Sequence, residues 1–107
     1  MSDYCPERWV VLEFKSGDLI TRKVFGGWYG GYTGGDCWRL NSGITEVRID
    51  GNQYEFDGFS GSTYFCNRHD YGMSSYQTQI LAGWVKQAEM RGDYEITEIA
   101  LEDIVVS

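Results

Sequence analysis

Residues 26–35 read Gly26-Gly27-Trp28-Tyr29-Gly30-Gly31-Tyr32-Thr33-Gly34-Gly35, so three Gly-Gly pairs recur every four residues with aromatic residues between them. Glycine loses more backbone entropy on ordering than any other residue, and six glycines in ten residues weaken a helix or a strand. The stretch therefore predicts an irregular loop. Its aromatic side chains should either pack onto the core or stand at the surface, where a ligand could stack on them.

The chain before this loop predicts a β-hairpin. Every second residue from Val10 to Phe14 is apolar, which is typical of a strand, here over residues 8–14, with one fully apolar face. Residues 15–18 contain Ser, Gly and Asp and predict a short turn. Residues 19–25 alternate again, so we expect this second strand to pair with the first.

The chain after the loop predicts short strands separated by turns rich in Gly, Asn, Asp and Ser. The expected strands cover residues 36–40, 44–49, 53–57 and 62–66, with turns at 41–43, 50–52 and 58–61. Across the turn at 50–52, Glu55 should lie opposite either Arg48 or Glu46, depending on the register. Residues 94–106 are β-like again.

One segment predicts a helix. Its apolar residues recur at the spacing of a single helical stripe: Tyr76, Ile80, Leu81, Trp84, Val85 and Ala88. Ser74 or Ser75 is a suitable N-cap, and Gly92 is the expected stop after Arg91. Gly83 weakens the helix by about 1 kcal/mol relative to alanine, so we expect it to let another backbone approach closely.

Together these elements predict an α+β fold. We expect a strongly bent antiparallel sheet of about five to seven strands, with one amphipathic helix packed on it. A half-open barrel is a close variant of this arrangement. The length of 107 residues suits one domain that covers residues 1–107.

The formal net charge of −7 is concentrated near the C-terminal end. Residues 93–107 contain no basic residue and the carboxylates of Asp93, Glu95, Glu98, Glu102 and Asp103. They form either a solvated strand face or an acidic edge that binds a basic partner. A surface that imitates DNA is not favoured, because arginines interrupt the carboxylates in the rest of the chain. The chain also lacks a basic stripe, so we expect no direct nucleic-acid binding.

Cys5, Cys37 and Cys66 are widely spaced, and the chain has no Cys-x-x-Cys pair. This pattern fits neither a disulfide framework nor a zinc knuckle. The sequence shows no secretion signal pattern and no apolar run long enough to cross a membrane. We therefore expect a soluble cytoplasmic protein without membrane attachment.

Few residues suggest catalysis. Cys66, His69 and Asp70 could form a thiol nucleophile with its base, but residues three apart at a strand end point in different directions. Carboxylates such as Glu55 and Asp57 occur on the exposed faces of most sheets. The Gly-rich stretch lacks the ending of a phosphate-binding loop. We therefore expect no catalytic residue, no metal site and no cofactor.

A binding site is better supported than a catalytic one. Aromatic residues of the Gly-rich stretch, donors that follow it and hydroxyls of the 58–61 region could meet at one end of the sheet: Trp28, Tyr29, Tyr32, Arg39, Asn41, Ser42, Ser60 and Ser62. Such a set suits a small planar anionic ligand, such as a nucleotide, or a protein partner anchored on aromatic side chains. Alternatively, the aromatic residues fold down over the core.

Two motifs carry a resemblance to a known group of proteins. They are Gly35-Asp36-Cys37-Trp38-Arg39-Leu40-Asn41-Ser42-Gly43-Ile44 and Gly58-Phe59-Ser60-Gly61-Ser62-Thr63-Tyr64-Phe65-Cys66, the second followed by Tyr71-Gly72. Over residues 22–85 the chain resembles small accessory proteins of tailed bacteriophages. The resemblance implies an antagonist of host defence in the host cytoplasm, which occupies a host protein or sequesters a nucleotide signal. It assigns no functional residues.

From these observations we expect a non-enzymatic, phage-encoded binding protein that inhibits a host factor by stoichiometric protein contact. The alternative is a protein that sequesters a small ligand, with Trp28, Tyr29, Arg39 and Asn41 as its pocket. A structural component of a virion or its assembly is a further alternative, although the chain lacks long arms. We expect a monomer or a homodimer, because the last strand could pair with a second copy.

Overall fold

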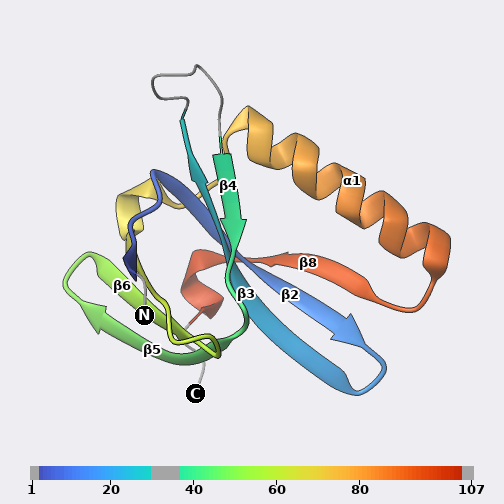
Figure 1. The fold of residues 1–107 in the computed structure, drawn as a ribbon, viewed down its shortest axis with the longest axis horizontal. Coiled ribbons are helices and arrows are strands. Elements are labelled where there is room, and N and C mark those ends of the chain that lie inside the picture. Colours follow the sequence, from blue (N-terminus) through green and yellow to red (C-terminus); the bar gives the residue numbers. More distant parts are fainter. Residues whose placement is uncertain (1–2, 30–36, 105–107) are drawn as a thin grey trace.

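The computed structural model describes residues 3–29 and 37–104, which form two four-stranded sheets and one long helix, α1 (Ser75–Arg91) (Figure 1). In sheet A the strands lie in the order β1 (Asp3–Tyr4), β7 (Thr63–Asn67), β6 (Gln53–Gly58) and β5 (Ile44–Asp50). In sheet B the order is β4 (Cys37–Leu40), β3 (Leu19–Trp28), β2 (Arg8–Ser16) and β8 (Glu95–Ile99). The predicted α+β class is confirmed. The strands are divided between two sheets, which do not close into a barrel.

Strand β2 is buried on both faces. Four consecutive side chains, Trp9, Val10, Val11 and Leu12, are 0% exposed. Because successive side chains of a strand point to opposite faces, Trp9 and Val11 lie toward sheet A, while Val10 and Leu12 lie toward α1. The sequence predicted one fully apolar face, and the structure buries the second face as well. Sheet B is therefore the middle layer of three.

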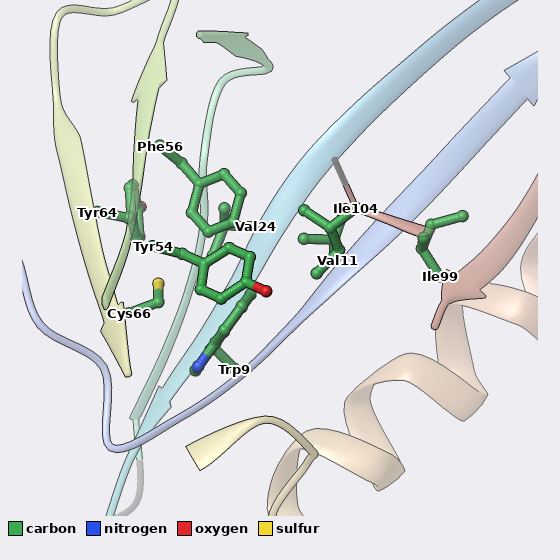
Figure 2. Packing of buried hydrophobic residues seen from close by; sticks show 9 residues of the cluster. All are labelled: Trp9, Val11, Val24, Tyr54, Phe56, Tyr64, Cys66, Ile99 and Ile104. Atoms are coloured by element: carbon green, nitrogen blue, oxygen red, sulfur yellow. The ribbon is translucent and has the colours of Figure 1, made fainter. Parts of the chain in front are cut away.

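The core between the two sheets is rich in aromatic residues (Figure 2). The ring centroid of Trp9 lies 5.6 Å from that of Tyr54 and 5.4 Å from that of Phe56. Tyr71 packs edge-on against the same indole at 4.7 Å. The Trp9 Nε1 donates a hydrogen bond to the Asn67 carbonyl oxygen at 2.7 Å. The indole thus packs sheet A against sheet B without leaving its polar atom unpaired.

Helix α1 covers the other face of sheet B, as its apolar stripe predicted. Ile80, Leu81 and Trp84 of the stripe pack against a second core cluster, which contains the buried Phe25 of β3. The ring centroids of Phe25 and Trp84 lie 5.0 Å apart. Figure 1 shows the helix on the side of sheet B that faces away from β5 and β6.

Gln77 attaches the start of α1 to sheet B. Its backbone N–H donates to the hydroxyl of the N-cap Ser74, and its side-chain oxygen accepts from the Ser74 N–H, which is a capping box. The Gln77 Nε2 donates in turn to the Phe25 carbonyl oxygen at 3.2 Å, and the whole side chain is buried. At the other end, Gly92 adopts φ +73° and stops the helix as predicted.

The first residues of the glycine-rich stretch do not form the loop that its composition predicts. Strand β3 continues through Gly26 and Gly27 to Trp28, so the prediction was wrong for these three residues. Glycine is needed at positions 26 and 27 because neighbouring groups leave no room for a Cβ atom. A Cβ on Gly26 would come within 2.9 Å of the Pro6 Cβ, and a Cβ on Gly27 would overlap the side-chain amide of Gln77. Glycine here allows other groups to approach the strand closely. Residues 30–35 lie outside the described ranges.

Smaller differences concern the ends of the chain and one glycine. Strand β1, which pairs in parallel with β7, was not predicted. After β8 the chain forms a 3-10 turn (Leu101–Asp103), so the β-like segment predicted for residues 94–106 is shorter. A second 3-10 turn covers Arg68–Asp70. Nothing lies within 4 Å of a Cβ built on Gly83, so the expected close approach of another backbone is wrong there.

Two glycine-to-alanine substitutions should change stability in opposite directions. Gly27→Ala should lower the free energy of unfolding by about 1–3 kcal/mol, because the added methyl group displaces the buried Gln77 amide. Gly83→Ala should raise it by about 0.5–1 kcal/mol, since alanine is the better helix former and meets no neighbour. Urea unfolding of both variants measures the two changes, and changes of the same sign would contradict this packing.

The Tyr71 hydroxyl bridges the backbones of β2 and β8 at the last residue pair of their ladder. Its hydroxyl donates to the Ile99 carbonyl oxygen and accepts from the Val11 N–H at 3.4 Å, and these two residues face each other in the register. Burial raises the pKa of Tyr71 to about 12. The folded state therefore favours the neutral phenol, which is the form that can donate to Ile99.

Tyr71→Phe should lower the free energy of unfolding at neutral pH by about 1–3 kcal/mol, because the Val11 N–H and the Ile99 carbonyl lose their partner. The wild-type protein should also lose stability as the pH rises from 10 to 12. In that window the unfolded state releases the Tyr71 proton while the folded state keeps it, so ionisation favours unfolding.

Urea unfolding at a series of pH values tests both expectations, and the alkaline decline should be shallower in Tyr71→Phe than in the wild type. Tyr29→Phe removes the hydroxyl of an exposed tyrosine and serves as the control at neutral pH. A decline of equal steepness in Tyr71→Phe and wild type would show that this hydroxyl does not cause the alkaline loss.

Candidate functional site

Strands β3 and β4 bring part of the predicted binding site together. Their antiparallel register places Trp28 opposite Cys37 and Gly26 opposite Arg39. Directly opposite residues share a face of a sheet, so Trp28, Cys37 and Arg39 lie on the same face of sheet B. Two of the predicted site residues, Trp28 and Arg39, are therefore neighbours in space.

The N-terminal segment adds a residue to this face that the sequence did not predict. The ring of Tyr4 lies 4.5 Å from the Arg39 guanidinium carbon, a cation–π contact, and edge-on to Trp28 at 6.4 Å. The Trp28 Nε1 donates to the Cys5 carbonyl oxygen at 3.0 Å. Tyr4 is held in place because β1 pairs with β7, where the Tyr64 ring packs 5.0 Å from it.

We define the aromatic–arginine surface as Tyr4, Trp28, Cys37, Trp38 and Arg39, which line a depression of about 240 Å³. Trp38 packs at 5.0 Å against Trp84 of the helix and remains 39% exposed. Tyr29, the next residue after Trp28, is 51% exposed. Within residues 3–29 and 37–104, no carboxylate forms an ion pair with Arg39. The surface therefore combines the half-buried rings of Tyr4 and Trp28 with the exposed Arg39, and the side chain of Trp38 lies on the other face of β4, against the helix.

The remaining predicted residues lie elsewhere. Ser42, Ser60 and Ser62 lie where the chain leaves β4 and at the turn after β6. The Ser42 Oγ accepts from the Ser60 N–H at 2.9 Å and donates to the Ser60 hydroxyl at 3.2 Å. Trp28 lies opposite Cys37, the first residue of β4, whereas Ser42 follows the last residue of β4. At roughly 3.3 Å per residue, the serines are therefore more than about 10 Å from Trp28. The predicted site is thus divided into two groups, and Tyr32 lies outside the described residues.

Asn41 supports the backbone rather than an open site. It is 4% exposed, and its Oδ1 accepts from the Val24 N–H at 3.0 Å and from the Gly43 N–H at 3.2 Å. Its own N–H donates to the Val24 carbonyl oxygen at 2.9 Å. Asn41 thereby bonds to both the N–H and the C=O of Val24. Val24 is adjacent to Phe25, where the pairing of β3 with β4 ends. It is therefore not presented to a ligand at the surface.

Asn41→Ala should lower the free energy of unfolding by about 1–3 kcal/mol, because two buried N–H groups lose their acceptor. Ser62→Ala is the matched control, since no hydrogen bond of its hydroxyl occurs within the described residues, and it should change stability by less than about 0.5 kcal/mol. Urea unfolding measures both. Equal effects would contradict the backbone role of Asn41.

The thiol chemistry considered from the sequence is not assembled. Cys66 is fully buried in the core between the sheets, and burial raises the pKa of its thiol. A thiol in this environment stays protonated, which disfavours its use as a nucleophile. His69 is exposed in the 3-10 turn Arg68–Asp70. In the described part of the chain, no group of three or more His, Cys, Asp and Glu side chains could hold a metal ion.

The carboxylates considered for acid–base chemistry form an ion-pair network on sheet A. Arg48 lies opposite Glu55, which is one of the two predicted registers, and also contacts Glu46 and Asp57. Hydrogen bonds from Arg48 and Thr63 lower the pKa of Asp57 to about 2. Asp57 is therefore ionised at neutral pH and cannot serve there as a general acid.

No protein-family model, curated protein or solved structure matches the chain. No helix in the described ranges is both long and apolar enough to cross a membrane.

Proposed function

We propose that the chain is a non-enzymatic binding protein that acts by stoichiometric contact with a protein partner, through the aromatic–arginine surface and Tyr29. The observation that carries the proposal is the exposed group of Trp, Tyr and Arg side chains around the edge strand β4. These three residue types are enriched among the residues that dominate the binding energy of protein–protein interfaces. The contact with Tyr4 also restrains the Arg39 side chain, which reduces the entropy lost on binding.

The partner that this surface fits presents an apolar patch beside an acidic group, which pairs with Arg39. That the partner is a host factor, and that the protein is a phage-encoded inhibitor in the host cytoplasm, rests on the resemblance of residues 22–85 to phage accessory proteins. An inhibitor of this kind requires no catalytic residue, because it acts by occupying a surface of its target.

A small planar anionic ligand, such as a nucleotide, is the alternative occupant. Arg39 supplies a cation, and the rings of Tyr4 and Trp28 supply stacking surfaces. However, the depression of about 240 Å³ is smaller than the roughly 300–1,000 Å³ of most small-molecule pockets. Asn41, expected in such a pocket, is buried and bonded to the backbone. The shallow surface therefore favours a protein partner.

The test compares the wild-type protein with Tyr29→Ala/Arg39→Ala in affinity capture from a bacterial host lysate. Both side chains are exposed, so their removal should leave the fold intact. We expect the wild type to retain a protein in a fixed molar ratio, measured by native mass spectrometry. The variant should retain at least about tenfold less, because hot-spot residues dominate such contacts.

The control is Leu19→Ala/Ile20→Ala, which also removes two exposed side chains but at the far end of the β2–β3 hairpin. This variant should retain as much partner as the wild type. Equal losses in the two variants would contradict the proposed surface. An added mass of a few hundred daltons on the purified wild type, lost on unfolding, would instead support the small-ligand alternative.

A further inference from the structure

Strand β8 leaves one backbone edge of sheet B unpaired within the described residues. It pairs with β2 on one side only. The Tyr71 hydroxyl bridges the Val11 N–H and the Ile99 carbonyl, so the backbone groups of this opposed pair point toward each other. In an antiparallel ladder such residues alternate with residues whose backbone groups point outward. The N–H and C=O groups of Ile96 and Glu98 therefore point away from the sheet.

A groove of about 570 Å³ lies between the end of α1 and the start of β8, and Lys15 of the neighbouring strand β2 also lines it. Val85 and Ala88 of the helix and Ile96 of the strand give it apolar walls. A short connection joins α1 to β8 (Figure 1), and its residues Gly92, Asp93 and Tyr94 line the groove together with the first three residues of β8. Because Ile96 lines the groove, a side chain directly opposite it on a strand added at the β8 edge lies next to the groove.

The charge of the groove and the edge is predominantly negative. Three carboxylates there have no ion-pair partner among the described residues: Glu89 and Glu95, which line the groove, and Glu98 on β8. Asp93 also lines the groove and pairs with Arg91 at 3.4 Å. Lys15 is the one cation among the lining residues. This surface is complementary to a positively charged segment.

We propose that the β8 edge and this groove bind an extended, basic segment of a partner protein, which adds to sheet B as a further strand. The backbone of the segment bonds to the outward groups of Ile96 and Glu98. An apolar side chain opposite Ile96 lies at the groove beside Val85. The basic side chains next to it in the segment point to the other face of the sheet, where Glu95 lies. This edge is opposite to β4 in sheet B, so the proposal does not depend on the aromatic–arginine surface.

An extended basic segment fits this surface better than the other occupants. A helix has no free backbone groups to satisfy Ile96 and Glu98, whereas a strand does. A second copy of the chain pairing through β8 brings the carboxylates of two β8 strands together, and like charges across a strand pair are destabilising. The formal net charge of −7 also attracts basic partners from a distance and repels a second copy.

The test uses a synthetic peptide in which valine and lysine alternate. The peptide has about seven residues, which is a usual strand length. NMR titration of the wild-type protein should shift the amide signals of Ile96 and Glu98, whereas signals of β5, an edge strand of sheet A, should stay unchanged. A peptide N-methylated on alternate residues, which cannot form the ladder, should bind at least about tenfold more weakly. Arg39→Ala should bind the unmodified peptide as the wild type does.

Charge variants complete the test. Glu95→Gln/Glu98→Gln should weaken binding by roughly fivefold, in line with exposed charge pairs. Glu46→Gln/Asp50→Asn removes the same charge from β5 and should bind like the wild type. Equal binding of the N-methylated peptide, or equal losses in the two charge variants, would overturn the proposal. The proposal would also be overturned if the chain self-associated and the peptide disrupted this self-association, because the β8 edge would then bind a second copy of the chain.

Discussion

Strand β2 must be covered on both faces, and the rest of the structure depends on this constraint. The side chains of Trp9 to Leu12 are all fully buried, and burial of large apolar side chains contributes roughly 1.5–3 kcal/mol each. A single sheet with one helix would leave one face of β2 in contact with water unless the sheet bent back over it. The chain instead divides its strands into two sheets. Sheet A covers Trp9 and Val11, and α1 covers Val10 and Leu12.

Polar side chains then connect these layers at the points where backbone pairing stops. Gln77 caps the helix and bonds to the Phe25 carbonyl, and it reaches β3 only because Gly27 has no Cβ. Tyr71 bridges the last pair of the β2–β8 ladder, and Asn41 pairs with Val24 beyond β4. Each of these residues satisfies backbone groups that would otherwise be buried without a partner. The same physical requirement explains a glutamine, a tyrosine and an asparagine that have unrelated sequence contexts, and the glycine that makes room for the glutamine.

The features that depend on neighbours in the sequence were predictable, and those that depend on distant segments were not. Ser74 and Gly92 mark the helix ends by local chemistry, and the predicted helix is confirmed. The partnership of Tyr4 with Arg39 depends on a two-residue parallel strand, which has no pattern of its own. Gly27 was predicted to lie in a loop. Glycine is needed at this position because the side chain of Gln77, which is distant in the sequence, packs against it. Residue type alone selected Trp28, Tyr29 and Arg39 for the candidate site, but it could not reveal that Asn41 was already bonded to the backbone.

In the described part of the chain, the two edges of sheet B carry opposite chemistry, which determines the kind of strand that could pair with each. Strand β4 is short and presents Arg39 beside aromatic rings, whereas β8 presents the carboxylates of Glu95 and Glu98. Charged residues on edge strands oppose association with a second copy. The repulsion at β8 is specific to like charge, so the same carboxylates that exclude another β8 strand attract a basic one. The carboxylates of Glu95 and Glu98 can therefore repel a second β8 strand and attract a basic strand. Protection of the edge against self-pairing and recognition of a partner at the edge would then have the same physical cause.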